Sequence, residues 1–192
     1  MNIAVLAAAG QGRRMGGGSN KAFLPLLSRP MLLRSAQALS ASNKIDEMII
    51  VAAPEEAAEV RRILSQDGTL KPWQVVAGGS ERQYSIANAL KALPAGTDYV
   101  AVHDAARPLV LPESVTAVVE AAQRQRAAGL AVPVKDTIKE SNADGCVVAT
   151  PPRERLWAIQ TPQVFEAALL RQAYDQAAAE GFLGTDDASL VE

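Results

Sequence analysis

The chain has 192 residues, of which 48% are hydrophobic and 21% charged, and its 19 basic and 21 acidic side chains leave a net charge of −2. This composition excludes an intrinsically disordered chain, and the near-neutral charge excludes binding of nucleic acid through bulk charge. One cysteine, Cys146, and one histidine, His103, exclude an internal disulfide, a four-thiolate zinc site and histidine-rich metal sites.

The absence of a basic leader before the first apolar run argues against a secretory signal. No apolar stretch approaches the length of a membrane span. We therefore expect a single domain that resides in the cytoplasm and does not contact a membrane.

Short apolar runs alternate with helical patterns along most of the chain. The strand-like runs cover residues 3–8, 48–52, 75–77, 99–102 and 130–134. The helical patterns cover residues 55–64, 82–93 (preceded by Ser80 and Glu81), 112–126 (closed by Gly129) and 166–180. Apolar runs without alternation are typical of strands buried on both faces. The sequence therefore predicts an α/β fold with a mostly parallel sheet between helices.

The pattern changes after residue 136. Asn142-Ala143-Asp144-Gly145 separates two β-like segments, residues 137–140 and 147–150. Asp-Gly between such segments is a hairpin signal. The sequence thus predicts a projecting antiparallel β-arm at about residues 136–156, which either reaches a partner subunit or forms a local flap.

A glycine-rich loop follows the first strand. It comprises Ala7-Ala8-Ala9-Gly10-Gln11-Gly12-Arg13-Arg14-Met15 and a glycine run that leads to Lys21. Small residues let backbone amides face phosphate oxygens, and the cations suit a triphosphate whose charge grows on the leaving pyrophosphate. Met15 replaces the third glycine of the dinucleotide fingerprint, and Lys21 lacks the neighbours of a Walker A lysine. A phosphate-binding loop is favoured over a solvated surface loop.

His103 to Pro108 follow the fourth predicted strand, where ligands of open α/β sheets bind. Asp104 is either a ligand of a divalent cation or a turn residue paired with Arg107. For His103, a hydrogen-bonded structural role is favoured over that of a catalytic base.

Three other segments carry polar side chains. Gly78 to Ser85 predict a helix start capped by Ser80, compatible with a base and ribose pocket. Arg153 either grips a phosphate or is solvated. Thr185 to Ser189 cap a helix, with Asp187 the expected cap, or supply carboxylates to a metal.

Six segments, in order, resemble the 2-C-methyl-D-erythritol 4-phosphate cytidylyltransferase family. They are Ala8-Ala9-Gly10-x-Gly12-x-Arg14-Met15 with Lys21, Gly78-Gly79-x-x-Arg82-x-x-Ser85, residues 102–108, residues 136–139, Thr161-Pro162-Gln163 and Thr185-Asp186-x-Ala188-Ser189. The resemblance implies a Rossmann-like nucleotide-diphosphosugar transferase fold. It implies transfer of CMP from CTP to methylerythritol phosphate with Mg²⁺, in the non-mevalonate route to isoprenoid precursors. It also implies a homodimer whose β-arms reach the neighbouring active site.

The resemblance assigns roles by position. The expected catalytic residues are Arg14, Lys21 and Arg153. The expected CTP-binding residues are Ala7, Ala8, Ala9, Gly10, Gly12, Gly79, Arg82, Ser85, Asp104 and Ala105, with Asp104 also the Mg²⁺ ligand. The expected sugar-phosphate-binding residues are Arg107, Thr137, Arg153 and Thr161.

Three alternatives remain open: a cytidylyltransferase for another polyol phosphate such as ribitol 5-phosphate, a dinucleotide-binding oxidoreductase, and a non-catalytic nucleotide-binding or dimerisation module. Family members continue past the Thr185–Ser189 segment into a strand and helix that carry Asn-Ile-Lys. The sequence up to Glu192 holds no counterpart, so we expect that strand and helix to be missing.

Overall fold

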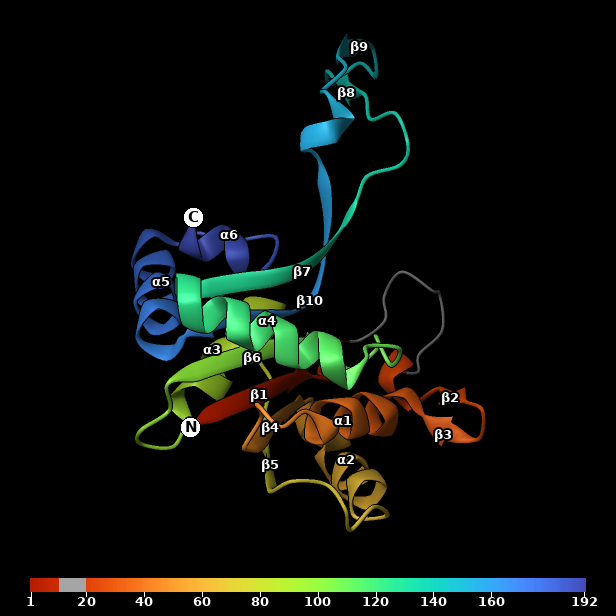
Figure 1. Cartoon of the computed structure of the whole chain (residues 1–192), viewed down its shortest axis with the longest axis vertical. Coiled ribbons are helices and arrows are strands. Elements are labelled where there is room, and N and C mark those ends of the chain that lie inside the picture. The colour runs from red at the N-terminus through yellow and green to blue at the C-terminus, as the bar shows by residue number, and fades with distance from the viewer. Residues whose placement is uncertain (11–19) are drawn as a thin grey trace.

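The computed structural model describes residues 1–10 and 20–192. At its centre lies a six-stranded sheet with the order β5-β4-β1-β6-β10-β7 (Figure 1). The strands are β1 (Asn2–Ala7), β4 (Glu47–Ala52), β5 (Trp73–Ala77), β6 (Tyr99–Asp104), β7 (Ala127–Pro133) and β10 (Trp157–Glu166). β5, β4, β1 and β6 run parallel, and β10 is antiparallel to both β6 and β7. The predicted α/β fold with a mostly parallel sheet is confirmed.

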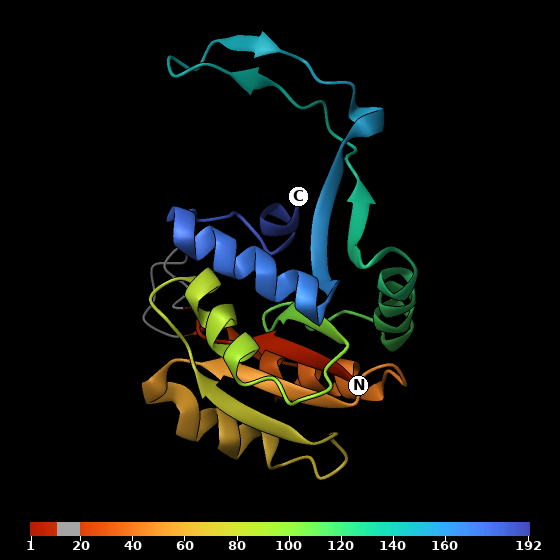
Figure 2. The same cartoon turned by 90° about the vertical axis from the view of Figure 1, so that its left-hand side faces the viewer.

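Helices cover both faces of this sheet (Figure 2). They are α1 (Met31–Ala41), α2 (Ala57–Leu64), α3 (Arg82–Lys91), α4 (Pro112–Gln125) and α5 (Ala167–Glu180). Successive residues of a strand point to opposite faces, so Leu6 joins the core under α1, α2 and α4, whereas Val5 joins the core under α3 and α5. Burial on both faces explains why the strands are continuous apolar runs. Among the described residues, no helix combines the length and apolar composition needed to cross a membrane.

The order of the strands fixes where a ligand binds. From β1 the chain passes to β4 and β5 on one side and then returns to β6 on the other side of β1. The connections that leave the carboxyl ends of β1 and β6 therefore diverge. Such a switch point leaves a crevice at that edge of an open sheet.

Three short elements follow the undescribed segment 11–19. They are η2 (Lys21–Phe23), β2 (Pro25–Leu26) and β3 (Arg29–Pro30), and a further turn, η3 (Pro54–Glu56), precedes α2. Two predicted helix signals are wrong. α3 begins after Glu81 without a side-chain cap, so Ser80 is not its cap. α4 ends at Arg126, a left-handed residue with φ 70°, whereas Gly129 lies inside β7.

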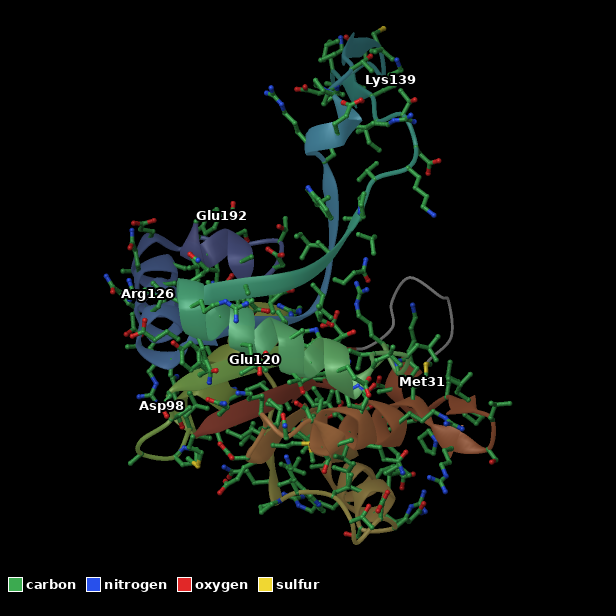
Figure 3. The ribbon with its side chains drawn as sticks, viewed as in Figure 1. Met31, Asp98, Glu120, Arg126, Lys139 and Glu192 are labelled. Atoms are coloured by element: carbon green, nitrogen blue, oxygen red, sulfur yellow. The ribbon has the colours of Figure 1, made fainter. Side chains whose placement is uncertain are left out.

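β7 and β10 lead out of the sheet into the arm, residues 136–156, which stands well away from the body (Figures 1 and 2). The arm contains β8 (Glu140–Ser141), β9 (Val147–Ala149) and η4 (Arg153–Arg155). Gly145 adopts φ 79° in the turn, which confirms the predicted Asp-Gly hairpin. Lys139 marks the distal part of the arm in Figure 3, far from Asp98 beside the N-terminus.

Candidate active site

A cavity of about 710 Å³ opens beside the carboxyl ends of β1 and β6. Four segments line it: residues 7–10, residues 20–22, residues 79–82 with Ser85, and Asp104 with Ala106. This is the crevice that the switch point creates, and most residues predicted to bind CTP meet in it. Gly12 and Arg14 lie outside the described residues.

Two segments beside the cavity approach each other closely at Gly78. A Cβ atom on Gly78 would lie 2.6 Å from Cβ of Ala9, so only glycine fits here. The amide of Gly78 donates to the carbonyl of Ala52 at 2.7 Å, and that of Gly79 donates to Oγ of Ser85 at 3.0 Å. These hydrogen bonds fix the glycine turn between the end of β4 and the first turns of α3, with Gly78 beside Ala9.

Lys21 is held at the cavity by its neighbour Asn20. The buried Asn20 amide donates to the carbonyl of Ala8 at 2.6 Å and to Oε2 of Glu56 at 2.7 Å. Its Oδ1 atom accepts the backbone amide of Ala22 at 3.0 Å and so caps η2. The backbone at Lys21 is therefore anchored through Asn20 to the end of β1. Sequence reasoning missed Asn20, although a polar residue directly before a short helical turn is a cap signal.

Arg82 lies between two carboxylates. Its Nη2 atom donates to Oδ2 of Asp187 at 2.7 Å and lies 3.5 Å from Oδ1 of Asp104. Burial alone would lower the pKa of Arg82, but the two carboxylates raise it, so the guanidinium stays charged. Tyr174 donates to the other oxygen of Asp187 at 2.5 Å, and burial together with this carboxylate raises the pKa of Tyr174.

The side chain of Asp187 is thus occupied by Arg82 and Tyr174. Asp187 does precede α6 (Ala188–Val191), but the predicted side-chain cap is wrong. Asp186 takes that role, since its Oδ1 atom accepts the amide of Ser189 at 3.0 Å.

Asp104 lies on the other side of the crevice and is paired with Arg107. Nε of Arg107 donates to Oδ2 of Asp104 at 3.2 Å, and the guanidinium also contacts Oε1 of Gln160. The backbone amide of Asp104 donates to Oγ1 of Thr161 at 3.2 Å. Buried His103 bonds to Thr161 and to the backbone of Arg107. Burial lowers the pKa of His103 to about 4, so it is neutral at pH 7 and sits behind the site.

The remaining predicted residues lie elsewhere. Ala105 is buried in the core, with its amide bonded to the carbonyl of Ala7, and its neighbour Ala106 lines the cavity. Thr137 and Arg153 lie on the arm. Nη1 of Arg153 donates to the carbonyl of Lys135, where the arm begins, at 3.1 Å.

The donor set suits a magnesium ion that arrives with a nucleotide. Within residues 1–10 and 20–192, no three His, Cys, Asp or Glu side chains gather as a metal cage. Mg²⁺ commonly takes only one or two protein carboxylates and completes its shell with phosphate oxygens and water. Asp104 is 33% exposed and faces the cavity, so it fits that pattern.

Comparison with known proteins gives one consistent family. Residues 2–192 match the family model described as 2-C-methyl-D-erythritol 4-phosphate cytidylyltransferase. A protein of that name from Symbiobacterium thermophilum is 50% identical over 188 residues, 98% of this chain and 78% of its own. Another from Caldanaerobacter subterraneus subsp. tengcongensis is 44% identical, over 100% of this chain and 86% of its own. The crystal structure of the Thermus thermophilus protein of that name superposes with a TM-score of 0.76 at 33% identity, covering 100% of this chain and 83% of that one.

Proposed function

The chain belongs to the 2-C-methyl-D-erythritol 4-phosphate cytidylyltransferase family, and we infer that it transfers CMP from CTP to 2-C-methyl-D-erythritol 4-phosphate. The products are 4-diphosphocytidyl-2-C-methyl-D-erythritol and pyrophosphate, and the reaction serves isoprenoid precursor biosynthesis. The structural observation that carries this conclusion is one cavity that joins Lys21, Arg82 and Asp104 to the small-residue segment 7–10. We place the reaction in the cytoplasm, where CTP is available.

The residues that line the cavity are proposed to hold CTP. The backbone of residues 7–10 approaches the triphosphate closely because small side chains leave room for it. The glycine turn at Gly79 and the hydroxyl of Ser85 line the place proposed for the base and ribose. Ala105 is buried below it and fixes the course of the backbone beside the ribose. Gly12 and Arg14 remain predicted members of this phosphate site.

The chemistry needs alignment and charge neutralisation rather than proton transfer. A phosphate oxygen of methylerythritol phosphate forms a bond to the α-phosphorus of CTP. The bond from that phosphorus to the α,β-bridging oxygen breaks, and pyrophosphate leaves with the electron pair. The attacking phosphate monoester is ionised near neutral pH, so no general base is required. Lys21, with the predicted Arg14, offsets the charge that grows on pyrophosphate.

Asp104 is proposed to hold Mg²⁺ together with phosphate oxygens of CTP. A divalent cation held there would neutralise phosphate charge and so would reduce the repulsion between the two anionic substrates. Arg82 and Arg107 keep the Asp104 carboxylate in place at the edge of the cavity.

The second substrate is proposed to bind between Arg107 and Thr161 of one subunit and Thr137 and Arg153 of its partner. Arg107 and Thr161 adjoin Asp104, whereas Thr137 and Arg153 lie on an arm that points away from the body of its own chain (Figure 1). A homodimer whose arms exchange brings these two groups together. Arg153 then grips the substrate phosphate and completes the catalytic set.

The decisive experiment measures pyrophosphate release from CTP and Mg²⁺ with either methylerythritol phosphate or ribitol 5-phosphate. We expect a higher kcat/KM with methylerythritol phosphate. Preference for ribitol 5-phosphate would reassign the polyol, and binding of CTP without turnover would support a non-catalytic module instead.

A further inference from the structure

His103 is the only histidine of the sequence and is 0% exposed. Its Nε2 atom lies 3.1 Å from the carbonyl oxygen of Arg107, and its Nδ1 atom lies 3.0 Å from Oγ1 of Thr161. The imidazole therefore connects two residues proposed to bind the second substrate. No step of the proposed reaction uses the imidazole.

The partners of the ring determine where its proton lies. A carbonyl oxygen only accepts hydrogen bonds, so Nε2 of His103 carries the proton and donates it to Arg107. The ring is buried, and neither of its hydrogen-bond partners among the described residues is a carboxylate, so it is neutral and Nδ1 has a lone pair. The hydroxyl of Thr161 must then donate to Nδ1.

The direction of this hydrogen bond determines which hydrogen bonds Thr161 can still form with a ligand. Its one proton is committed to His103, and one of its two lone pairs accepts the amide of Asp104 at 3.2 Å. One lone pair remains. Thr161 is therefore poised to accept a hydrogen bond, which a hydroxyl group donates and an ionised phosphate does not.

We propose that His103 is a positioning residue that turns the Thr161 hydroxyl into an acceptor for a hydroxyl group of the polyol substrate. The proposal rests on the proposed function, and it makes the polyol chain, rather than the phosphate, the group that Thr161 recognises. Selection among polyol phosphates is then set partly by a residue that never touches the substrate.

Two substitutions of His103 each retain one of the two hydrogen bonds of the imidazole and remove the other. The amide of glutamine reaches as far as Nε2, so His103→Gln retains a donor for Arg107 and loses the acceptor for Thr161. The shorter amide of asparagine reaches only the Nδ1 position, so His103→Asn retains the acceptor and loses the donor. We expect His103→Gln to raise KM for methylerythritol phosphate about tenfold, with KM for CTP changed less than about twofold. His103→Asn should raise KM for methylerythritol phosphate by less than about threefold.

Ser42→Ala is the matched control for loss of a buried hydrogen bond. Ser42 is 1% exposed and bonds to Thr116 at 2.8 Å, at the end of α1. We expect this variant to lower the melting temperature and leave both KM values unchanged. A melting temperature measured for every variant shows that each is folded at the assay temperature.

Analogues of methylerythritol phosphate that each lack one hydroxyl identify the group that Thr161 recognises. Thr161→Val should raise KM for the full substrate about tenfold and should have no effect for the analogue that lacks the partner hydroxyl. A penalty that persists with every analogue overturns the proposal, as does a larger effect of His103→Asn than of His103→Gln on KM for methylerythritol phosphate. Absence of wild-type turnover would refute the proposed function as well, whereas normal wild-type turnover with these contrary results refutes the His103 proposal alone.

Discussion

Asp187→Asn removes one negative charge from a fully buried position and keeps the shape of the side chain. The carboxylate is 0% exposed and holds Arg82 at 2.7 Å and Tyr174 at 2.5 Å. Removing one partner of a buried ion pair costs about 3–5 kcal/mol of stability. Arg82 is 35% exposed and therefore keeps part of its hydration, so we expect a loss nearer about 2–3 kcal/mol.

The substitution should also disturb the nucleotide site. Without Asp187, the ion pair that Arg82 keeps within residues 1–10 and 20–192 is the longer one of 3.5 Å with Asp104. We expect KM for CTP to rise several-fold while KM for methylerythritol phosphate changes less. Urea unfolding followed by circular dichroism gives the stability, and steady-state kinetics gives the two KM values.

Tyr174→Phe provides the graded comparison. It removes one hydrogen bond to the same carboxylate and leaves the ion pair with Arg82, so it should cost roughly 1.5–3 kcal/mol with little effect on CTP. A loss below about 1 kcal/mol for Asp187→Asn would refute the argument that this ion pair is both buried and structurally important. An unchanged KM for CTP would show that Arg82 is not positioned by Asp187.

Four further predictions test the site and the fold. Lys21→Ala should lower kcat roughly 10²-fold or more, with a small effect on KM, because its charge acts on the leaving pyrophosphate. Arg153→Ala should chiefly raise KM for methylerythritol phosphate, and mixing it with Lys21→Ala subunits should restore about a quarter of wild-type activity if arms exchange in a symmetric dimer. Gly78→Ala should weaken CTP binding and destabilise by about 1–3 kcal/mol, because its Cβ would lie 2.6 Å from that of Ala9. Burial lowers the pKa of His103 to about 4 from 6.5, so the unfolded chain binds this proton more readily, and stability should fall by roughly 3 kcal/mol as the pH drops from 6.5 to 4.

Each of these predictions has a contrary outcome, and for Gly78→Ala it is unchanged stability together with unchanged CTP binding. An unchanged kcat would remove Lys21 from the catalytic set, and an effect of Arg153→Ala on CTP alone would separate the arm from the polyol site. Mixtures without recovered activity would mean that each arm serves its own chain. Because other groups titrate over the same range, the pH argument is tested by the difference between wild type and His103→Gln. If the free energy of unfolding falls equally with pH in the two proteins, the pH argument is disproved.

The parallel strands were predictable because a strand that is buried on both faces has apolar residues at successive positions. β1 and β4 are continuous apolar runs, and alternate residues of each pack under helices on opposite sides. β10 was missed because Pro162 lies within it, and proline argues against an inner strand. The register of β10 with β7 shifts between Ile159 and Gln163, so the strand tolerates this residue at an irregularity. α1 was missed because Pro30, at its N-cap, gives no capping side chain.

The sequence predicted the site residues whose local motif indicates their role. It did not predict the residues whose role depends on contacts with other segments of the chain. Asp104 and Lys21 stand in motifs and line the cavity. Tyr174 lies in the middle of α5 and resembles an ordinary apolar contact, yet its hydroxyl reaches Asp187 beside Arg82. No local pattern reports a bond between residues so far apart in the sequence. Asp187 was noticed, but as a helix cap, because only the tertiary fold supplies the competing partners.

The two halves of the proposed site differ in what holds them in place. The nucleotide half is built at strand ends, where Gly78, Asn20 and Arg82 are each fixed by contacts to other segments of the core. The polyol half combines such a fixed group, Thr161 on His103, with Arg153 on an arm. If the nucleotide half forms without the arm, removal of the Arg153 side chain leaves CTP binding intact. If the polyol half requires the partner subunit, its affinity depends on dimerisation, and KM for methylerythritol phosphate should rise on dilution below the dimer dissociation constant while KM for CTP stays constant.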